Sequence, residues 1–407
     1  MTDRRITAEW LQNNAIQTVF DAIEREGDAA RVVGGAVRNS LLDKPVADID
    51  IATTAAPPVV AERTERAGLK VIPTGIDHGT VTVISSGVAY EITTLREDVE
   101  TFGRQAKVRF GRDWMEDARR RDFTMNALYC DRSGAIHDPL GGLADCIERR
   151  VRFIGSARDR IQEDYLRILR FFRIHAAYGS GKPDPEGLTA CVHEREGLRS
   201  LSAERIGMEM KRLVVAPLAP QCLSLMENRG LLEIVTGGVS RIADFTAFRG
   251  LAPDVPEVYE PALALAALVG FVDEDMDRLS DRLRLSNSER KRMHRALAAG
   301  SELIAKPVDP AVVDRRKLLY RHGRQTSVDG VVLAYSRESE TPLKRDLLDL
   351  LACLRSGEIP EFPLKGRDLL ANGIAPGPDV GRVLERLESC WVESEFSLTA
   401  KELISRI

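Results

Sequence analysis

The distribution of strand signals along the chain is the feature that most constrains its fold. Short β-type runs occur only before about residue 158, and amphipathic segments with helical spacing follow one another from there onward. The low aromatic content, 5%, also favours a largely helical protein over a β-sandwich. The sequence therefore predicts an α+β protein, in which a small head with a mixed sheet is followed by helices.

The head is predicted to begin with a helix and to continue with short strands. Apolar residues at helical spacing indicate a helix over 7–26, which Gly27 ends. A charged run from 96 to 121 lacks both periods, which predicts a mobile loop on the head. A Ser-Ser-Gly turn predicts a hairpin between the last two of the expected strands. These strands are expected at 31–33, 48–52, 80–84 and 89–94.

Acidic residues at period-two spacing form the first candidate site. Asp48 and Asp50 flank Ile49 on a predicted strand, so their carboxylates point to one face while Ile49 points to the core. Carboxylate oxygens are ligands that Mg²⁺ prefers, and Glu91 in another β-type run could complete a metal triad. Taken alone, such an aspartate pair is more often two solvated residues at a strand edge, and Glu91 is equally well explained as an outward-facing residue.

Two glycines form the second candidate site. Gly34 and Gly35 lie between a predicted strand and a predicted helix, where the backbone can approach a phosphate group. Without other motifs, a Gly-Gly pair is more often a plain turn.

The charge distribution bears on the partner of this protein. The net charge of −4 does not by itself indicate nucleic-acid binding. However, residues 149–173 contain eight arginines against three acidic residues, while 253–281 is strongly acidic. A local basic stripe of this kind is what RNA binding requires.

The six cysteines and the apolar segments indicate a cytoplasmic protein. The cysteines are scattered without a CxxC pair, so neither a zinc site nor a disulfide framework is expected. The N-terminal residues lack an apolar signal core, and the longest apolar run, 261–272, is too short to span a bilayer. We therefore expect no membrane association, and no stable protein partner is predicted.

Taken together and in this order, the motifs resemble class II tRNA nucleotidyltransferases and bacterial poly(A) polymerases, whose heads belong to the DNA polymerase β-like superfamily. One position departs from the pattern, because Asn39 stands where the family usually has Asp. The matching strings are Val33-Gly34-Gly35-Ala36-Val37-Arg38, Asp48-Ile49-Asp50, His78-Gly79-Thr80-Val81, Glu91-Ile92-Thr93-Thr94, Arg120-Arg121-Asp122-Phe123-Thr124-Met125-Asn126, Asp138-Pro139-Leu140-Gly141-Gly142, Glu163-Asp164-Tyr165-Leu166-Arg167 with Arg170 and Arg173, and Ser202-Ala203-Glu204-Arg205-Ile206.

The resemblance implies roles for these residues. Asp48, Asp50 and Glu91 would hold two Mg²⁺ ions and serve as the catalytic residues. Arg121 would donate to the triphosphate, and Asp122 would accept from a sugar hydroxyl. The nucleotide-binding set implied by the resemblance is Gly34, Gly35, Arg38, Arg121, Asp122, Asn126, Asp164, Arg167, Arg170 and Arg173.

Selection of the incoming base is assigned, through the same resemblance, to an arginine-rich helix. Steps of three residues from Asp164 are expected to place it and Arg167 near one face of that helix. Asp164 would then present an acceptor and Arg167 a donor, which matches the amino group and ring nitrogen of cytosine and adenine. A surface helix with charges at this spacing would explain the same pattern without any role in binding.

The implied arrangement is a head over 1–150, a helical neck over 151–225 that recognises the nucleotide base, a helical body over 226–345 and a helical tail over 346–407 that binds tRNA. The implied activity is template-independent addition of CMP, CMP and AMP, from CTP and ATP, to the 3′ end of tRNA. Three alternatives remain, namely a poly(A) polymerase, an enzyme that adds only CC or only A, and a non-catalytic RNA-binding protein with a polymerase-like head. The sequence leaves open the oligomeric state and the number of nucleotides added.

Overall fold

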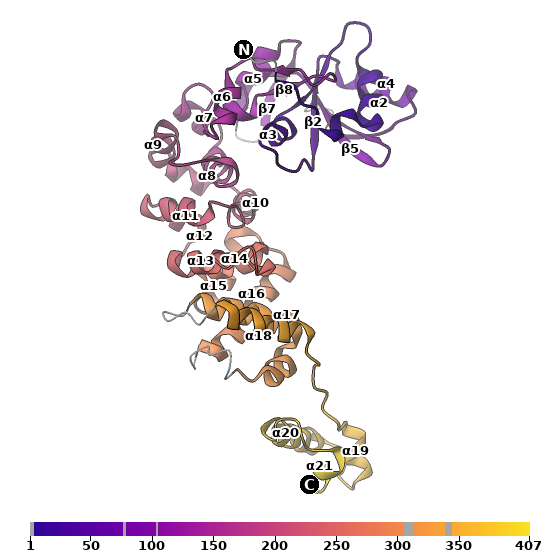
Figure 1. Ribbon diagram of the computed structural model, residues 1–407, viewed down its shortest axis with the longest axis vertical. Helices are drawn as coiled ribbons and strands as arrows, with labels where there is room; N and C mark the ends of the chain where they lie inside the picture. Colours follow the sequence, from indigo (N-terminus) through magenta and orange to yellow (C-terminus); the bar gives the residue numbers. More distant parts are fainter. Residues whose placement is uncertain (1–3, 76–78, 103–104, 305–312, 338–343) are drawn as a thin grey trace. The chain divides into compact units, whose positions relative to one another are not determined.

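The computed structural model describes residues 4–75, 79–102, 105–304, 313–337 and 344–407 (Figure 1). The chain divides into two compact units, Met1–Val235 and Thr236–Ile407. The finer division into head, neck, body and tail stays a prediction.

The first unit begins with two helices rather than the single one predicted over 7–26. These are α1 (Glu9–Gln12) and α2 (Asn14–Ile23), separated by Asn13. The Asn13 side chain accepts a hydrogen bond from the backbone N–H of Ala15 at 2.9 Å, which caps α2 and interrupts the helix before it. One face of α2 is buried, including Ile16, Val19, Phe20 and Ile23.

A mixed sheet of seven strands forms the centre of this unit. Its order is β3-β4-β5-β2-β1-β8-β9, in which only the pairing of β2 with β5 is parallel. The strand bounds are β1 (Ala30–Val33), β2 (Ile49–Thr53), β3 (Lys70–Gly75), β4 (Thr80–Ser85), β5 (Val88–Thr94), β8 (Tyr129–Cys130) and β9 (Ile136–His137).

The four strands predicted from the sequence are present, and β4 and β5 form the predicted hairpin. The sequence did not reveal β3, because it contains Pro73, and proline within a β-type run counts against a strand. β3 lies at the edge of the sheet, where a residue without a backbone N–H is tolerated. Helices α3 (Gly35–Leu41) and α4 (Pro57–Arg66) pack against the sheet.

The expectation of a loop over 96–121 is wrong for its first part. β6 (Arg96–Phe102) and β7 (Gln105–Phe110) pair as a separate antiparallel ribbon. The sequence of β7 does alternate apolar Ala106, Val108 and Phe110 with polar residues, a strand-like period that the prediction passed over because the surrounding run is strongly charged. After the ribbon come α5 (Trp114–Arg119) and a 3₁₀ turn, η2 (Thr124–Asn126).

Helices complete the first unit, as predicted. A continuous arginine-rich helix through Glu163 and Asp164 was expected, but the helix is broken there, because Asp164 is extended with φ −156° and ψ 105°. The Asp164 carboxylate accepts from the backbone N–H of Leu166 at 3.1 Å and so caps the next helix. The helices are α6 (Gly142–Ile147), α7 (Ala157–Glu163), α8 (Leu166–Tyr178), α9 (Pro185–His193), α10 (Ala203–Leu213), α11 (Ala219–Asn228) and α12 (Leu232–Thr236).

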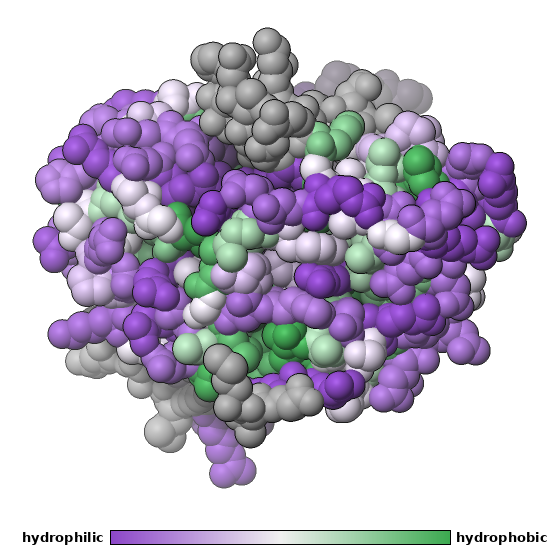
Figure 2. Space-filling model, turned by 90° about the horizontal axis from the view of Figure 1, so that it is seen from above, coloured by the Kyte–Doolittle hydropathy of each residue, from purple (hydrophilic) through white to green (hydrophobic). Residues whose placement is uncertain are grey.

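Helices are the only regular secondary structure among the described residues of the second unit, which together with the mixed sheet of the first unit confirms the predicted α+β class. Residues 261–269 of the apolar run 261–272 form α14, and its residues after Pro261 are all buried, so α14 is a core helix. Within the described residues, no helix combines the length and apolar character needed to cross a membrane. The face drawn in Figure 2 is mostly hydrophilic, with small hydrophobic patches between polar residues. The helices are α13 (Ile242–Arg249), α14 (Pro261–Val269), α15 (Asp273–Leu283), α16 (Asn287–Ile304), α17 (Arg315–Ser336), α18 (Lys344–Ser356), α19 (Gly366–Ala371), α20 (Pro378–Glu393) and α21 (Ala400–Ile404).

Candidate functional site

The three candidate metal-binding carboxylates lie on neighbouring strands. Asp50 in β2 is directly opposite Glu91 in β5 in the parallel register, and Asp48 immediately precedes β2. Asp48, Asp50 and Glu91 are exposed, while Ile49 and Ile51 are buried, so the acidic and apolar residues alternate as the sequence predicted. The sheet therefore brings carboxylates more than 40 positions apart in the sequence to one place.

The charges of these acids act on one another. Partial loss of hydration raises the pKa of Asp50, and the negative charges of Glu91 and Asp48 raise it further. The positive charge of Arg121 lowers it, but does not outweigh them. None of the three carboxylates forms a hydrogen bond or ion pair with another described residue, so their oxygens are available to a cation. In the described part of the chain, no group of three His, Cys, Asp or Glu side chains is already arranged around a metal position. The metal triad therefore stays a prediction.

The glycine pair leads from β1 into α3. Gly34 has φ 71°, a conformation that favours glycine, and a Cβ atom there would lie 3.5 Å from the Asn126 carbonyl oxygen and 3.8 Å from a terminal nitrogen of Arg121. The turn at Gly34 therefore lies beside two other predicted site residues. Gly35 is the first residue of α3.

Arg38 in α3 is a buried guanidinium with no carboxylate partner among the described residues. Its side chain donates to the Asn126 side-chain oxygen at 2.6 Å and to Asn39 at 2.9 Å, and it lies over the Tyr178 ring at 3.6 Å. The residue is only 6% exposed. Burial lowers the pKa of Arg38, as expected for a cation that has lost water without gaining a counter-ion. Such a group is well suited to an anionic ligand.

The segment containing Arg121 and Asp122 is held by ion pairs. Arg121 contacts the carboxylate of Asp117 at 3.0 Å, and the Tyr129 hydroxyl donates to the same carboxylate at 2.8 Å. Burial alone would lower the pKa of Arg121, but Asp117 outweighs it and the pKa is raised. Asp117 is 1% exposed and also pairs with Arg120, a support that the sequence did not indicate.

Asp122 lies at the centre of a hydrogen-bond network that joins the predicted head to helices α8 and α10. It accepts from the Asn126 amide at 3.1 Å and from Arg170 in α8 at 2.8 and 2.5 Å. Burial alone would raise the pKa of Asp122, but the Arg170 charge and these hydrogen bonds outweigh it and the pKa is lowered. Glu209 in α10 then pairs with both Arg170 and Arg173.

This network brings together five of the predicted nucleotide-binding residues, namely Arg38, Asn126, Asp122, Arg170 and Arg173. Glu209 was missed, because no sequence pattern linked it to residues 36 positions earlier.

The two predicted base-selecting residues take part in separate ion pairs. Asp164 accepts from Arg205 at 2.7 Å, whereas Arg167 donates to Glu163 at 2.5 Å and to the Arg160 carbonyl oxygen at 2.6 Å. Arg205 stands in the stretch 202–206 that resembled the family, but Arg160 was not singled out by the sequence. A pocket of about 450 Å³ is bounded by Asp164, Arg205 and their neighbours. The base-selecting role stays a prediction.

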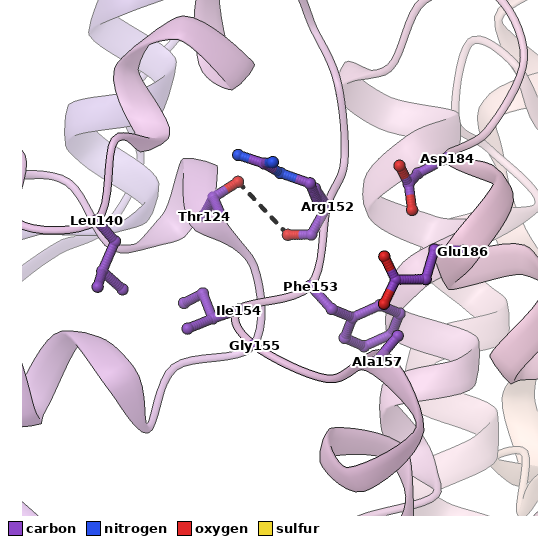
Figure 3. Close-up of a pocket in the computed structure, with 9 residues that line it drawn as sticks. All are labelled: Thr124, Leu140, Arg152, Phe153, Ile154, Gly155, Ala157, Asp184 and Glu186. Atoms are coloured by element: carbon purple, nitrogen blue, oxygen red, sulfur yellow. Dashed lines mark hydrogen bonds between the residues drawn. The ribbon is translucent and has the colours of Figure 1, made fainter.

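A second cavity, of about 280 Å³, lies between Thr124 in η2, the stretch 152–157 and the start of α9 (Figure 3). Thr124 and Arg152 line it, and the Thr124 hydroxyl donates to the Arg152 carbonyl oxygen at 3.4 Å. None of the predicted site residues lines this cavity, so we do not assign it to nucleotide binding. His78, which matched a family motif, lies outside the described residues.

Known proteins resemble this chain over nearly its whole length. Residues 30–152 match the family described as the Poly A polymerase head domain. The mouse protein named CCA tRNA nucleotidyltransferase 1, mitochondrial, is 32% identical over 408 residues, which is 98% of this chain and 90% of the mouse protein. The CCA-adding enzyme of Leuconostoc citreum is 32% identical over 391 residues, 94% of this chain and 92% of that enzyme.

A solved structure shows the same architecture. The Bacillus stearothermophilus CCA-adding enzyme, in complex with CTP, matches with a TM-score of 0.75 and 28% identity, covering 94% of each chain. The resemblance of the head to the polymerase β-like fold is thereby confirmed. With its head motifs, its helical remainder and relatives that match over 94% or more of its length, the chain belongs to the family of CCA tRNA nucleotidyltransferases.

Proposed function

We propose that this chain builds the CCA end of tRNA by adding CMP, CMP and AMP, from CTP and ATP, to the 3′ hydroxyl without a nucleic-acid template. Its relatives are named for this activity, and the related Bacillus enzyme was solved with CTP. The observation that carries the proposal is the in-register pair of Asp50 and Glu91, which are exposed and without partners among the described residues. Asp50 is opposite Val33, the residue before the Gly34 turn, and it lies within reach of the charge of Arg121.

Nucleotidyltransferases in general use divalent metal ions, and we assign two Mg²⁺ ions to this site. Asp48, Asp50 and Glu91 would hold them, since their oxygens are hard ligands and are not engaged elsewhere in the described chain. When bound, Mg²⁺ would supply positive charge at the reacting phosphate and at the attacking 3′ hydroxyl. The mutual repulsion of the three carboxylates is relieved by such a cation, which is why the arrangement fits a metal site.

Two arginines, Arg38 and Arg121, would bind the triphosphate, and Asp122 would bind the ribose. Arg38 is the best phosphate donor on physical grounds, because it is buried without an acidic partner among the described residues. Arg121, beside Gly34, would add a second donor, and the turn at Gly34 and Gly35 lets the backbone approach. Asp122 would accept from a sugar hydroxyl.

The remaining members of the set would keep Asp122 and Arg38 in place. Asn126 contacts both of them, and Arg170 contacts Asp122. Arg173 shares the carboxylate of Glu209 with Arg170.

Base selection would rest on Asp164 and Arg167. A carboxylate only accepts and a guanidinium only donates, so this pair matches the amino and ring-nitrogen edge of cytosine or adenine and mismatches uracil and guanine. Engaging a base would require each residue to share or exchange its present partner, Arg205 for Asp164 and Glu163 for Arg167.

We place the protein in the cytoplasm. All six cysteines are free thiols, and four of them are buried, as in proteins of reducing compartments. The mouse relative is named as mitochondrial, so the compartment needs a direct test, for example by fractionation of the source cells.

A poly(A) polymerase is the rival function that a specific observation favours, because the matching head family carries that description. One experiment separates the two. The purified protein is incubated with tRNA that lacks its CCA end, with CTP, ATP and Mg²⁺, and the product 3′ ends are sequenced. We expect CCA, whereas CC or A alone would narrow the activity and long A tails would overturn the proposal. Chelation of the metal with EDTA should stop the reaction, and Mg²⁺ should restore it.

A further inference from the structure

Arg160 in α7 connects the helical part of the first unit to the backbone of the Arg121 segment. Its guanidinium donates to the carbonyl oxygens of Arg120 and Arg121, the latter at 2.8 Å. The side chain is 12% exposed, so these contacts are largely shielded from water. The next residue of the contacted segment is Asp122, the predicted ribose ligand. A helix residue thereby fixes the main chain that carries two predicted nucleotide contacts.

The same arginine is tied to the predicted base-selecting residue. Glu163, three positions along α7, accepts from Arg160 and also from Arg167 at 2.5 Å. Arg167 in turn donates to the carbonyl oxygen of Arg160 at 2.6 Å. Two guanidinium groups thus share one carboxylate.

The positive charges of Arg160 and Arg167 repel each other. Burial lowers the pKa of Arg160, and the nearby charge of Arg167 lowers it further. The arrangement holds because Glu163 and the carbonyl oxygens of the Arg121 segment together offset this repulsion.

We infer that Arg160 is a positioning residue for nucleotide selection, which holds Arg167 at a fixed distance from the Arg121 and Asp122 segment. The inference rests on the proposed function. A protein that selects a base without a template must hold the base-contacting group in register with the groups that bind ribose and phosphate. The planar guanidinium of Arg160 can satisfy two carbonyl oxygens and a carboxylate at once, which the single ammonium of lysine cannot do in the same geometry.

The test compares Arg160→Lys with a matched control on the same helix. Arg158 also pairs with a glutamate, Glu194 at 2.7 Å, but its side chain is 67% exposed and it contacts none of the predicted site residues, so Arg158→Lys is the control. For each variant, kcat/KM is measured with CTP, ATP, UTP and GTP on tRNA ending at the appropriate position, and Tm is recorded.

We expect Arg160→Lys to lower kcat/KM for the correct nucleotides by on the order of tenfold to a hundredfold, the scale seen when a reacting group is displaced by about 1 Å. Discrimination against UTP and GTP should fall at the same time. Arg158→Lys should leave both quantities within about twofold of the wild type, as is usual for surface substitutions.

A double-mutant cycle identifies the route of the effect. In an Arg167→Ala background, Arg160→Lys should produce no further loss of discrimination, because the group that it positions is absent. The inference is overturned if Arg160→Lys lowers only Tm or the rate with all four nucleotides equally, or if its effect on discrimination adds in full to that of Arg167→Ala. Failure of the proposed function has a different signature, since the wild-type protein would then not add CMP and AMP to tRNA at all.

Discussion

At the scale of single residues, the carboxylates of β2 and β5 are the first group to test. Asp50→Ala removes an exposed side chain that has no partner among the described residues and that is repelled by Glu91 and Asp48. Nucleotide addition should therefore fall by about a hundredfold or more, because a metal ligand is lost, while Tm stays the same or rises slightly. The measurement is primer extension on tRNA together with thermal unfolding. Turnover near the wild-type rate in Mg²⁺ would remove Asp50 from the metal site.

Asn39 shows how the structure explains a departure from a family pattern. Its side-chain oxygen accepts from Arg38 at 2.9 Å, and its amide nitrogen donates to the Pro45 carbonyl oxygen at 2.7 Å. The orientation of the amide follows from the chemistry, since arginine can only donate and a carbonyl can only accept. Asn39 thus links Arg38 to the loop that leads to Asp48.

We predict that Asn39→Asp, which restores the usual family residue, impairs this particular chain. The carboxylate cannot donate to Pro45, a loss of about 0.5–1.5 kcal/mol, and its charge neutralises Arg38. KM for CTP and ATP should rise severalfold, and Tm should fall slightly. Steady-state kinetics at saturating tRNA give the first quantity. An unchanged KM would mean that Arg38 does not contact the triphosphate.

The sequence indicated the residues that are proposed to carry chemistry but not most of the residues that hold them. Asp48 and Asp50 stand in a short local pattern, and Arg38 stands in a string that resembles the family. Arg205, by contrast, contacts Asp164 across 41 positions and Glu209 contacts Arg173 across 36. Such pairs arise from helix packing, which no local pattern in one sequence encodes.

At the scale of secondary-structure elements, the break between α7 and α8 could not be read from the sequence. Charged residues at steps of three from Asp164 fit one continuous helix as well as they fit two separate helices. The break between α7 and α8 is marked only by the Asp164 side chain, which caps α8. The ribbon of β6 and β7 was missed because the short alternation of apolar and polar residues in β7 stands within a strongly charged run. Four strands of the central sheet, β1, β2, β4 and β5, were predictable because each contains a β-type run, whereas β3, β8 and β9 were not predicted.

The contact between α15 and α16 leads to a prediction of how the stability of the fold depends on pH. His294 in α16 lies between Asp273 at 2.9 Å and Asp277 at 2.8 Å. Burial alone would lower the pKa of His294, but the two aspartates outweigh it and the pKa is raised. The stabilisation is therefore fully present below the unfolded-state pKa of about 6.5 and is lost as pH rises through the higher folded-state pKa.

His294→Gln removes this titration. The difference in Tm between the wild type and His294→Gln should be largest near about pH 6 and should shrink as pH rises above the folded-state pKa. Thermal unfolding of both proteins across this range is the measurement. A difference that grows with pH would show that the histidine is buried in its neutral form.

At the scale of the whole molecule, net charge and partner must be reconciled. The chain carries −4 overall, yet it is proposed to bind a polyanion. Binding must then depend on local clusters of arginine and lysine rather than on the overall field. The affinity for tRNA should fall at least about tenfold between 50 and 200 mM salt, because bound counterions are released. A binding constant measured by filter retention that stays flat over this range would exclude phosphate contacts as the main source of affinity.

Every residue proposed here to contact the nucleotide or the metal lies in Met1–Val235. The unit Thr236–Ile407 carries none of these proposed contacts. Its tail is predicted to lie along the tRNA, so we expect substitutions there to change which RNA is bound while nucleotide preference stays the same. Exchange of the second unit between relatives, followed by measurement of tRNA affinity and nucleotide preference, tests this separation.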